Sequence, residues 1–257
     1  MTKFYHPFHM VSNSPWPLII SMETPLLLLG ILLYFHMKYP LILLMSLILI
    51  ISSSYQWWRD VSLEASYIGE YSSFSIYNLK IGVLMFIISE VMFFLSFFWG
   101  LFHMKLAPPF MGGALWPPFM VIPFNPVDIP LLNTLILLTS GLTATLAHFF
   151  LKMNKKKFMT FIFLSIILGL YFTTLQSWEY FNAKFTITDS VYGSIFFTAT
   201  GFHGLHVILG SSFLMIILYR SYIFHTNKIY HIGFEASLWY WHFVDVVWLF
   251  LFTFLYI

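Results

Sequence analysis

The chain has 257 residues, of which 60% are hydrophobic and only 9% are charged, and its formal net charge is +2. An ordinary soluble domain carries about 25% charged residues, so this composition excludes a typical water-soluble protein. The small net charge and the lack of a basic stripe argue against nucleic-acid binding. The absence of cysteine excludes disulfides, thiolate metal sites and cysteine nucleophiles. We therefore expect an all-α integral membrane protein.

Long apolar runs predict seven transmembrane helices, because backbone groups in lipid must hydrogen-bond within their own segment. The expected spans are residues 16–35, 39–58, 76–104, 129–151, 157–178, 190–220 and 233–256. A β-barrel is not expected, because several runs exceed the roughly 9–11 residues of a spanning strand. The polar stretch 59–75 and the proline-rich stretch 106–118 are the expected long connections. The first of them could separate a two-helix hairpin from a five-helix bundle.

The distribution of Lys and Arg predicts that the N-terminus faces inside and the C-terminus outside. In that orientation the inner ends hold nine basic residues, Lys3, Arg59, Lys80, Lys152, Lys155, Lys156, Lys157, Arg220 and Lys228. The outer ends hold three, Lys38, Lys105 and Lys184. An inner excess of basic residues is the pattern that membrane insertion follows. The run KMNKKK at 152–157 is expected to be a solvated loop, or alternatively a segment that attracts anionic lipid.

One carboxylate, Glu90, lies near the middle of the third span. Since a helix rises about 1.5 Å per residue, Glu90 is expected near the midplane of a hydrocarbon core about 30 Å thick. A charge there costs at least a few kcal/mol unless it is neutralised, paired or hydrated. On the same span Gly82, Ser89 and Ser96 recur every seven residues. That stripe predicts the close approach of a neighbouring helix.

Two histidines of the sixth span, His203 and His206, are three residues apart and therefore neighbours on one face. Two imidazoles could begin a metal or haem ligand set. Alternatively, each could hydrogen-bond within the bundle while Gly201, Gly204 and Gly210 allow close packing. A metal needs further ligands, and no cysteine supplies them. The spacing leaves both interpretations open.

Three polar residues of the seventh span, Glu235, His242 and Asp245, lie on roughly one side of the expected helix. They could pair within the bundle or form a proton relay. The same span carries tryptophans that are either interface anchors or packing aromatics, Trp239, Trp241 and Trp248. Two hypotheses follow. The protein uses its ionisable groups directly in catalysis or transport, or it is a non-catalytic bundle that packs against a catalytic subunit and binds lipid.

Six motifs in chain order resemble the cytochrome c oxidase subunit III family. They are HMVSNSPWPL (9–18), YQWWRDV (55–61), FIISEVMFFLSFFW (86–99), NPVDIPLLNT (125–134), YGSIFFTATGFHGLHV (192–207) and GFEASLWYWHFVDVVWLFL (233–251). The likeness runs over nearly the whole chain, and its form is similar to the mitochondrially encoded members.

The resemblance implies seven transmembrane helices, with the first two splayed from a five-helix bundle in a V whose cleft holds lipid. The corresponding division of this chain is 1–71 and 72–257. It also implies a non-catalytic core subunit of the oxidase that passes electrons from cytochrome c to oxygen, forms water and translocates protons. The subunit would support the stability and proton uptake of subunit I. The equivalent subunit of a haem-copper quinol oxidase is the alternative.

The implied location is the mitochondrial inner membrane, with the N-terminus in the matrix and the C-terminus in the intermembrane space. The implied partners are oxidase subunits I and II, which would hold the haem and copper, accessory subunits, and phospholipids such as cardiolipin, phosphatidylglycerol or phosphatidylethanolamine. No cofactor, metal or nucleic acid is expected in this chain.

Site residues are also implied by the resemblance. The family's lipid-contacting positions match at Trp57, Trp58, Glu90, Arg220 and His225. The expected buried structural polar groups are His203, His206, Glu235, His242 and Asp245. The sequence departs from the family's pattern at Leu63, Tyr71 and Met111, where relatives carry arginine, histidine and glutamate. The first two departures put lipid headgroup contacts of the loop after the second span in doubt.

Overall fold

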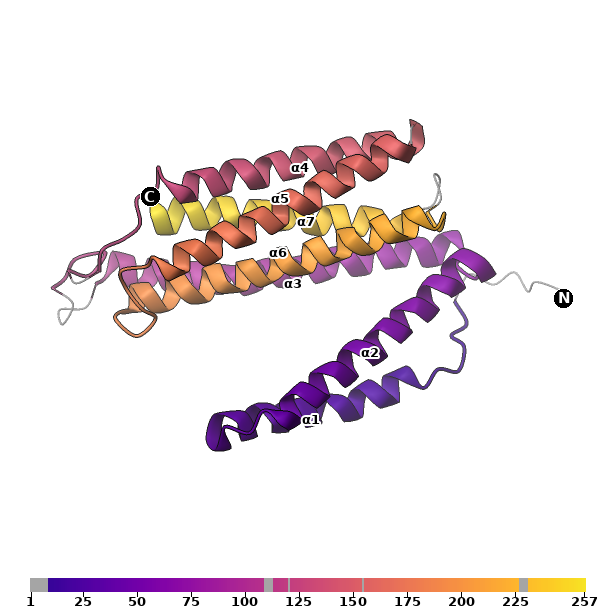
Figure 1. Ribbon diagram of the computed structural model, residues 1–257, viewed down its shortest axis with the longest axis horizontal. Coiled ribbons are helices and arrows are strands. Elements are labelled where there is room, and N and C mark those ends of the chain that lie inside the picture. Colours follow the sequence, from indigo (N-terminus) through magenta and orange to yellow (C-terminus); the bar gives the residue numbers. More distant parts are fainter. Residues whose placement is uncertain (1–8, 109–112, 120, 154, 227–230) are drawn as a thin grey trace. The chain divides into compact units, whose positions relative to one another are not determined.

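The computed structural model describes residues 9–108, 113–119, 121–153, 155–226 and 231–257. Its elements are α1 (Trp16–Met37), α2 (Leu41–Leu63), the π-helical turn η1 (Glu64–Ile68), α3 (Ser73–Leu106), α4 (Ile129–Met153), α5 (Lys155–Phe181), α6 (Val191–Tyr222), α7 (Ile232–Leu251) and the π-helical turn η3 (Phe252–Tyr256) (Figure 1). Within the described residues, seven helices are long and apolar enough to cross a membrane. The predicted number and position of the spans are therefore confirmed.

The chain divides into two compact units, residues 1–79 and residues 80–257, here called unit 1 and unit 2. Unit 1 contains the α1–α2 hairpin, and unit 2 contains α4 to α7 together with most of α3. The division between the units falls inside α3, whereas the sequence suggested a division at residues 71 and 72.

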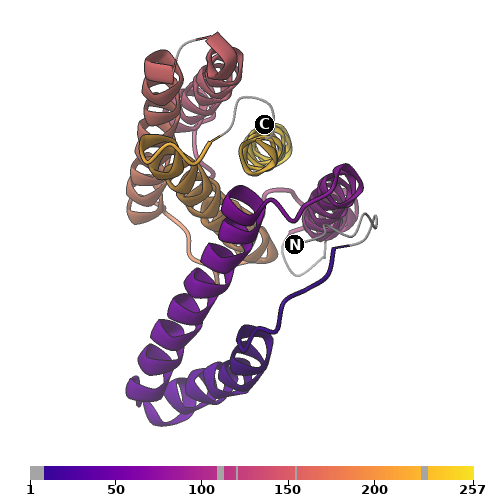
Figure 2. The same ribbon diagram turned by 90° about the vertical axis from the view of Figure 1, so that its right-hand side faces the viewer.

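The helices of the unit 1 hairpin meet near the interhelical turn and diverge from it in both ribbon views (Figures 1 and 2), with contacts between them at three levels. Near the interhelical turn, a Cβ on Gly30 would lie only 2.8 Å from the backbone of Leu43. Further along, the Ser53 hydroxyl donates to the Glu23 carboxylate at 2.6 Å. At the open end the indole N–H of Trp16 donates to Asp60 at 2.7 Å. A glycine contact and two polar contacts therefore fix how α1 packs on α2.

Two segments that were predicted to be connections are largely helical. Residues 59–68 continue α2 and η1, so most of the predicted linker 59–75 is helix. In the KMNKKK run, α4 ends at Met153 and α5 begins at Lys155, which leaves no long loop. The physical reason is the same in both places. Neither segment contains proline, and polar residues stop the hydrophobic signal without stopping the helix, because water can solvate their side chains beyond the lipid.

The bundle of unit 2 is packed around one side chain of α7, the fully buried Trp241. A Cβ on Gly169 of α5 or on Gly210 of α6 would lie 2.5 Å and 2.8 Å, respectively, from carbons of the Trp241 ring. The indole N–H of Trp241 donates to the hydroxyl of Ser140 on α4 at 3.0 Å. Trp241 therefore touches three other helices at once. Trp248 is also fully buried, so these two tryptophans are packing aromatics rather than interface anchors.

α3 meets the rest of unit 2 through long side chains. Phe93 contacts Phe202 of α6, with ring centroids 5.0 Å apart, and Phe98 contacts Phe254 of η3 at 5.5 Å. The predicted small-residue stripe plays no part in this packing, because a Cβ on Gly82 would meet no described atom within 4 Å. The serines of the stripe are exposed and donate to carbonyls of their own helix. Within unit 2 the stripe makes no such contact, so the approach of a neighbouring helix to it stays a prediction.

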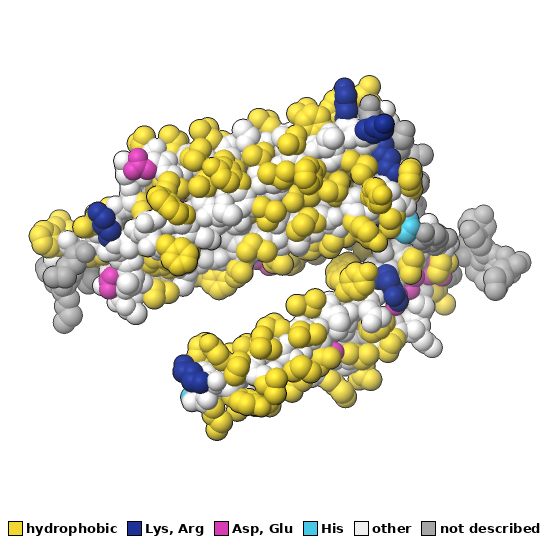
Figure 3. All heavy atoms as spheres, in the orientation of Figure 1, with side chains coloured by type: hydrophobic (Ala, Val, Ile, Leu, Met, Phe, Trp, Pro, Cys, Tyr) yellow, Lys and Arg dark blue, Asp and Glu magenta, His cyan; other side chains and the backbone are white. Residues whose placement is uncertain are grey.

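The outer faces of both units are apolar. Many large hydrophobic side chains are exposed, and they cover the visible sides of the helices in the space-filling view (Figure 3). Lys and Arg side chains lie near the helix ends in the same view. A surface of this kind is compatible with lipid or with other apolar protein surfaces.

The packing around Trp241 predicts opposite effects for two glycines of α6. Gly210→Ala should lower the free energy of unfolding by about 1–3 kcal/mol, because the added methyl overlaps a rigid, enclosed ring. Gly201→Ala is the matched control, since its nearest contact would be the Tyr180 hydroxyl at an ordinary 3.8 Å. Alanine is also the better helix former, by up to about 1 kcal/mol, so the control should be neutral or stabilising. Unfolding of the reconstituted chain by SDS measures the free energy of unfolding of both variants. An equal decrease in the two variants would contradict the close contact between Gly210 and Trp241.

Candidate functional site

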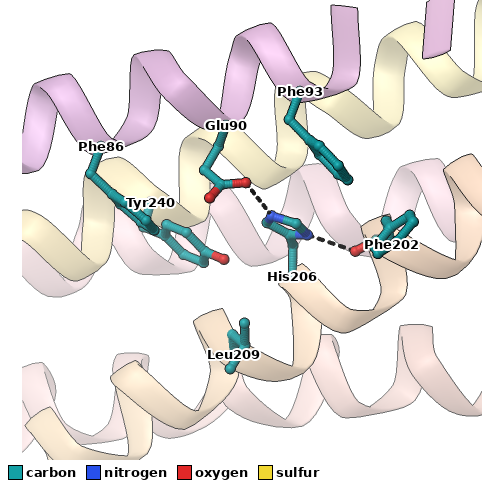
Figure 4. Close-up of a pocket in the computed structure, with 7 residues that line it drawn as sticks. All are labelled: Phe86, Glu90, Phe93, Phe202, His206, Leu209 and Tyr240. Carbon is teal, nitrogen blue, oxygen red and sulfur yellow. Dashed lines mark hydrogen bonds and ion pairs between the residues drawn. The ribbon is translucent and has the colours of Figure 1, made fainter. Parts of the chain in front are cut away.

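The acid in the middle of α3 pairs with a histidine of α6. The Nε2 atom of His206 lies 3.0 Å from Oε2 of Glu90 (Figure 4). The other ring nitrogen of His206, Nδ1, lies 2.6 Å from the carbonyl oxygen of Phe202. The side chain of Glu90 is 24% exposed and that of His206 is 11% exposed. Pairing reduces the cost of placing these groups at membrane depth.

The geometry fixes how many protons the pair holds. A carbonyl oxygen can only accept, so Nδ1 of His206 carries a hydrogen and donates it to Phe202. The contact between Nε2 and Glu90 then needs one more proton between the two atoms. Either a neutral carboxyl donates to a neutral imidazole, or an imidazolium donates to a carboxylate. In both forms the pair has no net charge.

Aromatic rings surround this pair. The His206 ring lies between Phe94, at a centroid distance of 5.1 Å, and Tyr240, at 6.1 Å. The pair borders a hollow of about 360 Å³ whose lining residues are Phe86, Glu90, Phe93, Phe202, His206, Leu209 and Tyr240 (Figure 4). A mostly apolar hollow with one polar pair at its wall suits an apolar chain or a small apolar molecule.

The second histidine of the expected pair has a different environment. His203 is completely buried, and neither ring nitrogen has a hydrogen-bond partner among the described residues. Its ring contacts Phe172 of α5 and Trp248 of α7, with centroids 5.6 Å and 5.2 Å apart. The expectation that each histidine hydrogen-bonds within the bundle is therefore confirmed for His206 and wrong for His203. Residues three apart are rotated by about 60° on a helix, enough to place one inside and one at the rim.

The polar residues of α7 form two separate groups. Glu235 forms an ion pair with Lys80 of α3 at 2.6 Å and contacts His231 at 3.5 Å. His242 lies 3.7 Å from Asp245, and a Cβ on Gly141 of α4 would lie 2.5 Å from the Asp245 carboxylate. Shared helical phase had suggested one row of three. Their partners come from different helices, so the structure gives no support to a single relay along α7.

Among the described residues, two groups bring together three side-chain atoms that could bind a metal ion. They are His148–His231–Glu235 and His9–Glu64–Glu70. Neither group includes His203, His206 or His242. The sequence had suggested no role for His148 or His231, because 83 residues separate the two histidines and no local motif joins them. Lys80 had entered only as one of the basic residues that set the orientation.

A further buried acid was also missed. Glu179 of α5 is only 2% exposed, and neither of its oxygens has a hydrogen-bond partner among the described residues. The hydroxyl of Tyr256 in η3 is beside it without satisfying hydrogen-bond geometry. The predicted fifth span stopped at residue 178, so Glu179 was counted as lying outside the membrane helix. The helix instead continues to Phe181.

Apart from Glu90, the residues matched to lipid contacts lie near the ends of two helices, α2 and α6. Trp57 and Trp58 of α2 are 36% and 74% exposed. At the end of α6 the backbone N–H of His225 donates to the carbonyl of Arg220 at 2.8 Å, with Phe224 in the left-handed conformation. This helix-ending turn places Arg220 and His225 at the same end of the helix.

Arg220 is partly buried, and its Nε atom has no hydrogen-bond partner among the described residues. No described carboxylate forms an ion pair with it. A cation in that position is suited to an anionic ligand.

The family departures after the second span can be placed in part. Leu63 is the last residue of α2 and is 37% exposed. The Tyr71 ring packs edge-on against His9 with centroids 4.8 Å apart, and burial raises the pKa of its hydroxyl. Met111 lies outside the described residues.

Fold and site together define a multi-pass helical membrane protein whose intramembrane ionisable groups are mostly paired within the chain. Comparison with known proteins is more specific. The family model for cytochrome c oxidase subunit III matches residues 6–257. The chain is 51% identical to cytochrome c oxidase subunit 3 of Ornithorhynchus anatinus, over 100% of this chain and 98% of that protein. It is 50% identical to the same subunit of Branchiostoma lanceolatum, over 98% and 96%, and of Equus caballus, over 100% and 98%.

This chain belongs to the cytochrome c oxidase subunit III family. It is therefore a membrane-embedded subunit of cytochrome c oxidase, respiratory complex IV, and assembles with other subunits of that enzyme.

The contrast between the two histidines of α6 leads to a stability prediction. His206→Leu removes two hydrogen bonds and leaves Glu90 unpaired, so it should lower the free energy of unfolding by about 1–3 kcal/mol. His203→Leu removes two polar atoms that have no partner and keeps a side chain of similar size, so stability should stay the same or rise. SDS unfolding of the reconstituted chain separates the two variants. An equal loss for His203→Leu would show that His203 has a partner after all.

Proposed function

We propose that this chain is a non-catalytic subunit of a proton-translocating cytochrome c oxidase, which passes electrons from cytochrome c to oxygen and forms water. Partner subunits I and II would hold the haem and copper. This chain would stabilise subunit I, support its proton uptake and bind phospholipid. The observation that carries the proposal is the family match over residues 6–257. The relatives reported above are named as cytochrome c oxidase subunits, so no observation favours the quinol-oxidase alternative.

The surroundings of Glu90 support a structural and modulatory role for this acid. A proton path needs a continuous series of polar groups or water. The side chains that line the hollow beside Glu90 and His206 are aromatic or aliphatic, with the Tyr240 hydroxyl the exception. Glu90 also has a dedicated partner on α6, which binds α3 to the bundle. A pair of this kind holds helices in place without passing protons onward.

A Glu90→Gln complex tests this role. Glutamine keeps the shape of the side chain and can still hydrogen-bond to His206, but it does not titrate. In the purified oxidase, oxygen reduction and proton release in the first turnovers should equal those of the wild type. Any defect should appear in sustained turnover or lipid content. Ser89→Ala, a change at the neighbouring exposed position, is the control. Pumping that is lost in the first turnovers of an intact complex would refute the modulatory role.

We further propose that the chain lies in the mitochondrial inner membrane with its N-terminus in the matrix. The support is the distribution of basic residues within unit 2. One end of its helices carries Lys80, Lys152, Lys155, Lys156, Lys157 and Arg220, and the other end carries Lys105 and Lys184. The excess marks the inner end. Lys3 and Lys228, which also entered the prediction, lie outside the described residues.

Introduced cysteines test the orientation, because the chain has none of its own. Met153 is the last residue of α4, next to the start of α5, and Phe181 is the last residue of α5, so the two lie at opposite ends of the bundle. They are 69% and 90% exposed, respectively. In mitochondria stripped of the outer membrane, an impermeant maleimide should label Phe181→Cys directly. Met153→Cys should be labelled only after the inner membrane is permeabilised. The reverse pattern would overturn the proposed orientation.

The proposed phospholipid contacts involve Trp57, Trp58, Glu90, Arg220 and His225. The tryptophans suit the level of the headgroups, and Arg220 can make charge-assisted hydrogen bonds to phosphate. Arg220 is the most informative of these residues, because it is partly buried and forms no ion pair with a described carboxylate.

Arg220→Ala should therefore lower the amount of phospholipid that stays with the purified complex. Arg59→Ala is the matched control, because the Arg59 guanidinium already pairs with Asp60 at 3.1 Å. Mass spectrometry of extracted lipid measures both variants. Lipid retention in Arg220→Ala that equals the wild type would remove Arg220 from the proposed contacts.

A further inference from the structure

Three ligand-type side chains converge at the end of unit 2 where α4 ends and α7 begins. The Nε2 atoms of His148 and His231 are 3.4 Å apart. The Nε2 atom of His231 is 3.5 Å from Oε1 of Glu235. The three ligand atoms all lie within 4.8 Å of one another. His148 comes from α4, His231 directly precedes α7, and Glu235 is in the first turn of α7.

These separations match the edges of a metal coordination polyhedron. Nitrogen and oxygen ligands lie about 2.0–2.1 Å from Zn²⁺, so neighbouring ligands around a tetrahedral ion are about 3.3–3.4 Å apart. The two contacts made by His231 are already at that spacing. His148 is exposed, so its ring can complete the third edge without moving the backbone. Two imidazoles and one carboxylate with an open fourth position form a known zinc ligand set.

The surroundings orient the ligands. The Lys80 ammonium of α3 forms an ion pair with Oε2 of Glu235 at 2.6 Å, while Oε1 contacts His231. Ligating carboxylates are commonly oriented by outer partners of this kind. The Phe234 ring packs edge-on against His148, with centroids 5.7 Å apart. His148 is exposed, so the cluster opens to the surface of unit 2.

The histidines must be neutral to bind a metal. Two imidazole nitrogens that face each other at 3.4 Å cannot both carry a hydrogen without repulsion. A shared cation satisfies both nitrogens and the carboxylate together.

We propose that His148, His231 and Glu235 form a binding site for a divalent transition-metal ion of the zinc class. Lys80 is the outer partner that positions the carboxylate, and water fills the fourth position. The bound ion joins the end of α4 to the start of α7. The proposal stands on the residues of this chain and does not depend on the subunit's role in the oxidase.

The second cluster of the chain provides a contrast. In unit 1, His9 and Glu64 approach to 3.7 Å, and Glu70 is exposed. This cluster contains one imidazole, and Glu64 already accepts a hydrogen bond from Ser12 at 2.7 Å. Zinc favours nitrogen ligands, so a cluster of one imidazole and two carboxylates is not expected to bind it as tightly.

The test uses the full-length chain in phospholipid nanodiscs with Zn²⁺ alone. Equilibrium dialysis should show one tightly bound ion per chain. His148→Ala and Glu235→Gln should each weaken binding by at least about 100-fold, since loss of an outer partner alone costs about 10–100-fold. His103→Ala, at an exposed histidine at the other end of α3, and His9→Ala are the controls and should bind as the wild type does. Helical circular dichroism checks that each variant is folded.

A ligand exchange keeps the test decisive if an alanine variant does not fold. His148→Cys places the sole thiol of the chain in the site, so Cd²⁺ should produce an ultraviolet thiolate-to-metal absorption band. His103→Cys should produce none. Wild-type zinc affinity in folded His148→Ala, loss of binding in His9→Ala, or no cadmium band in His148→Cys would each overturn the site.

Discussion

The packing of Trp241 against two glycines is the constraint on which the rest of unit 2 depends. In lipid, apolar side chains gain little by leaving the bilayer for a helix interface, so association relies on close packing and hydrogen bonds. A large ring can lie between helices only where the facing residues leave room, and Gly169 and Gly210 do so. The hydrogen bond from its indole to Ser140 adds α4 to the same contact. One residue of α7 thereby sets the positions of α4, α5 and α6.

The placement of α6 on this ring determines which of its polar groups face inward. His203 is enclosed by aromatic rings, while His206 reaches the rim, where α3 passes. α3 is connected to the bundle by long side chains, so its polar contacts count for more than those of closely packed helices. Glu90 and Lys80 each find a partner on a different helix of the bundle. These two acid–base contacts hold α3 in its register.

The same arrangement explains why a chain with intramembrane ionisable groups need not be the catalyst. The Glu90–His206 pair borders aromatic and aliphatic side chains, and His242 and Asp245 contact each other on the same helix. Protons need a continuous path, whereas helices need only local pairs. A subunit built in this way offers a largely apolar surface to lipid or to partner subunits. The polar cluster at the end of α4 and α7 differs, because it has more ligand atoms than hydrogen bonding requires.

The sequence by itself determined the class, the seven spans and the family, because lipid requires about 20 apolar residues per crossing and the long motifs are specific. It misplaced helix ends at residues 59–68 and 179–181. Hydropathy indicates where the apolar, lipid-facing segment ends, whereas the helix continues as long as its backbone hydrogen bonds do. It also listed Glu90 and His206 without joining them, because 116 residues separate the two and no periodicity relates side chains on different helices. Only the tertiary structure decided which acids have partners, that His203 has no hydrogen-bond partner among the described residues and that His148 meets His231. Those outcomes depend on how helices rotate against each other, and that rotation is set by glycine and tryptophan contacts distant in the chain.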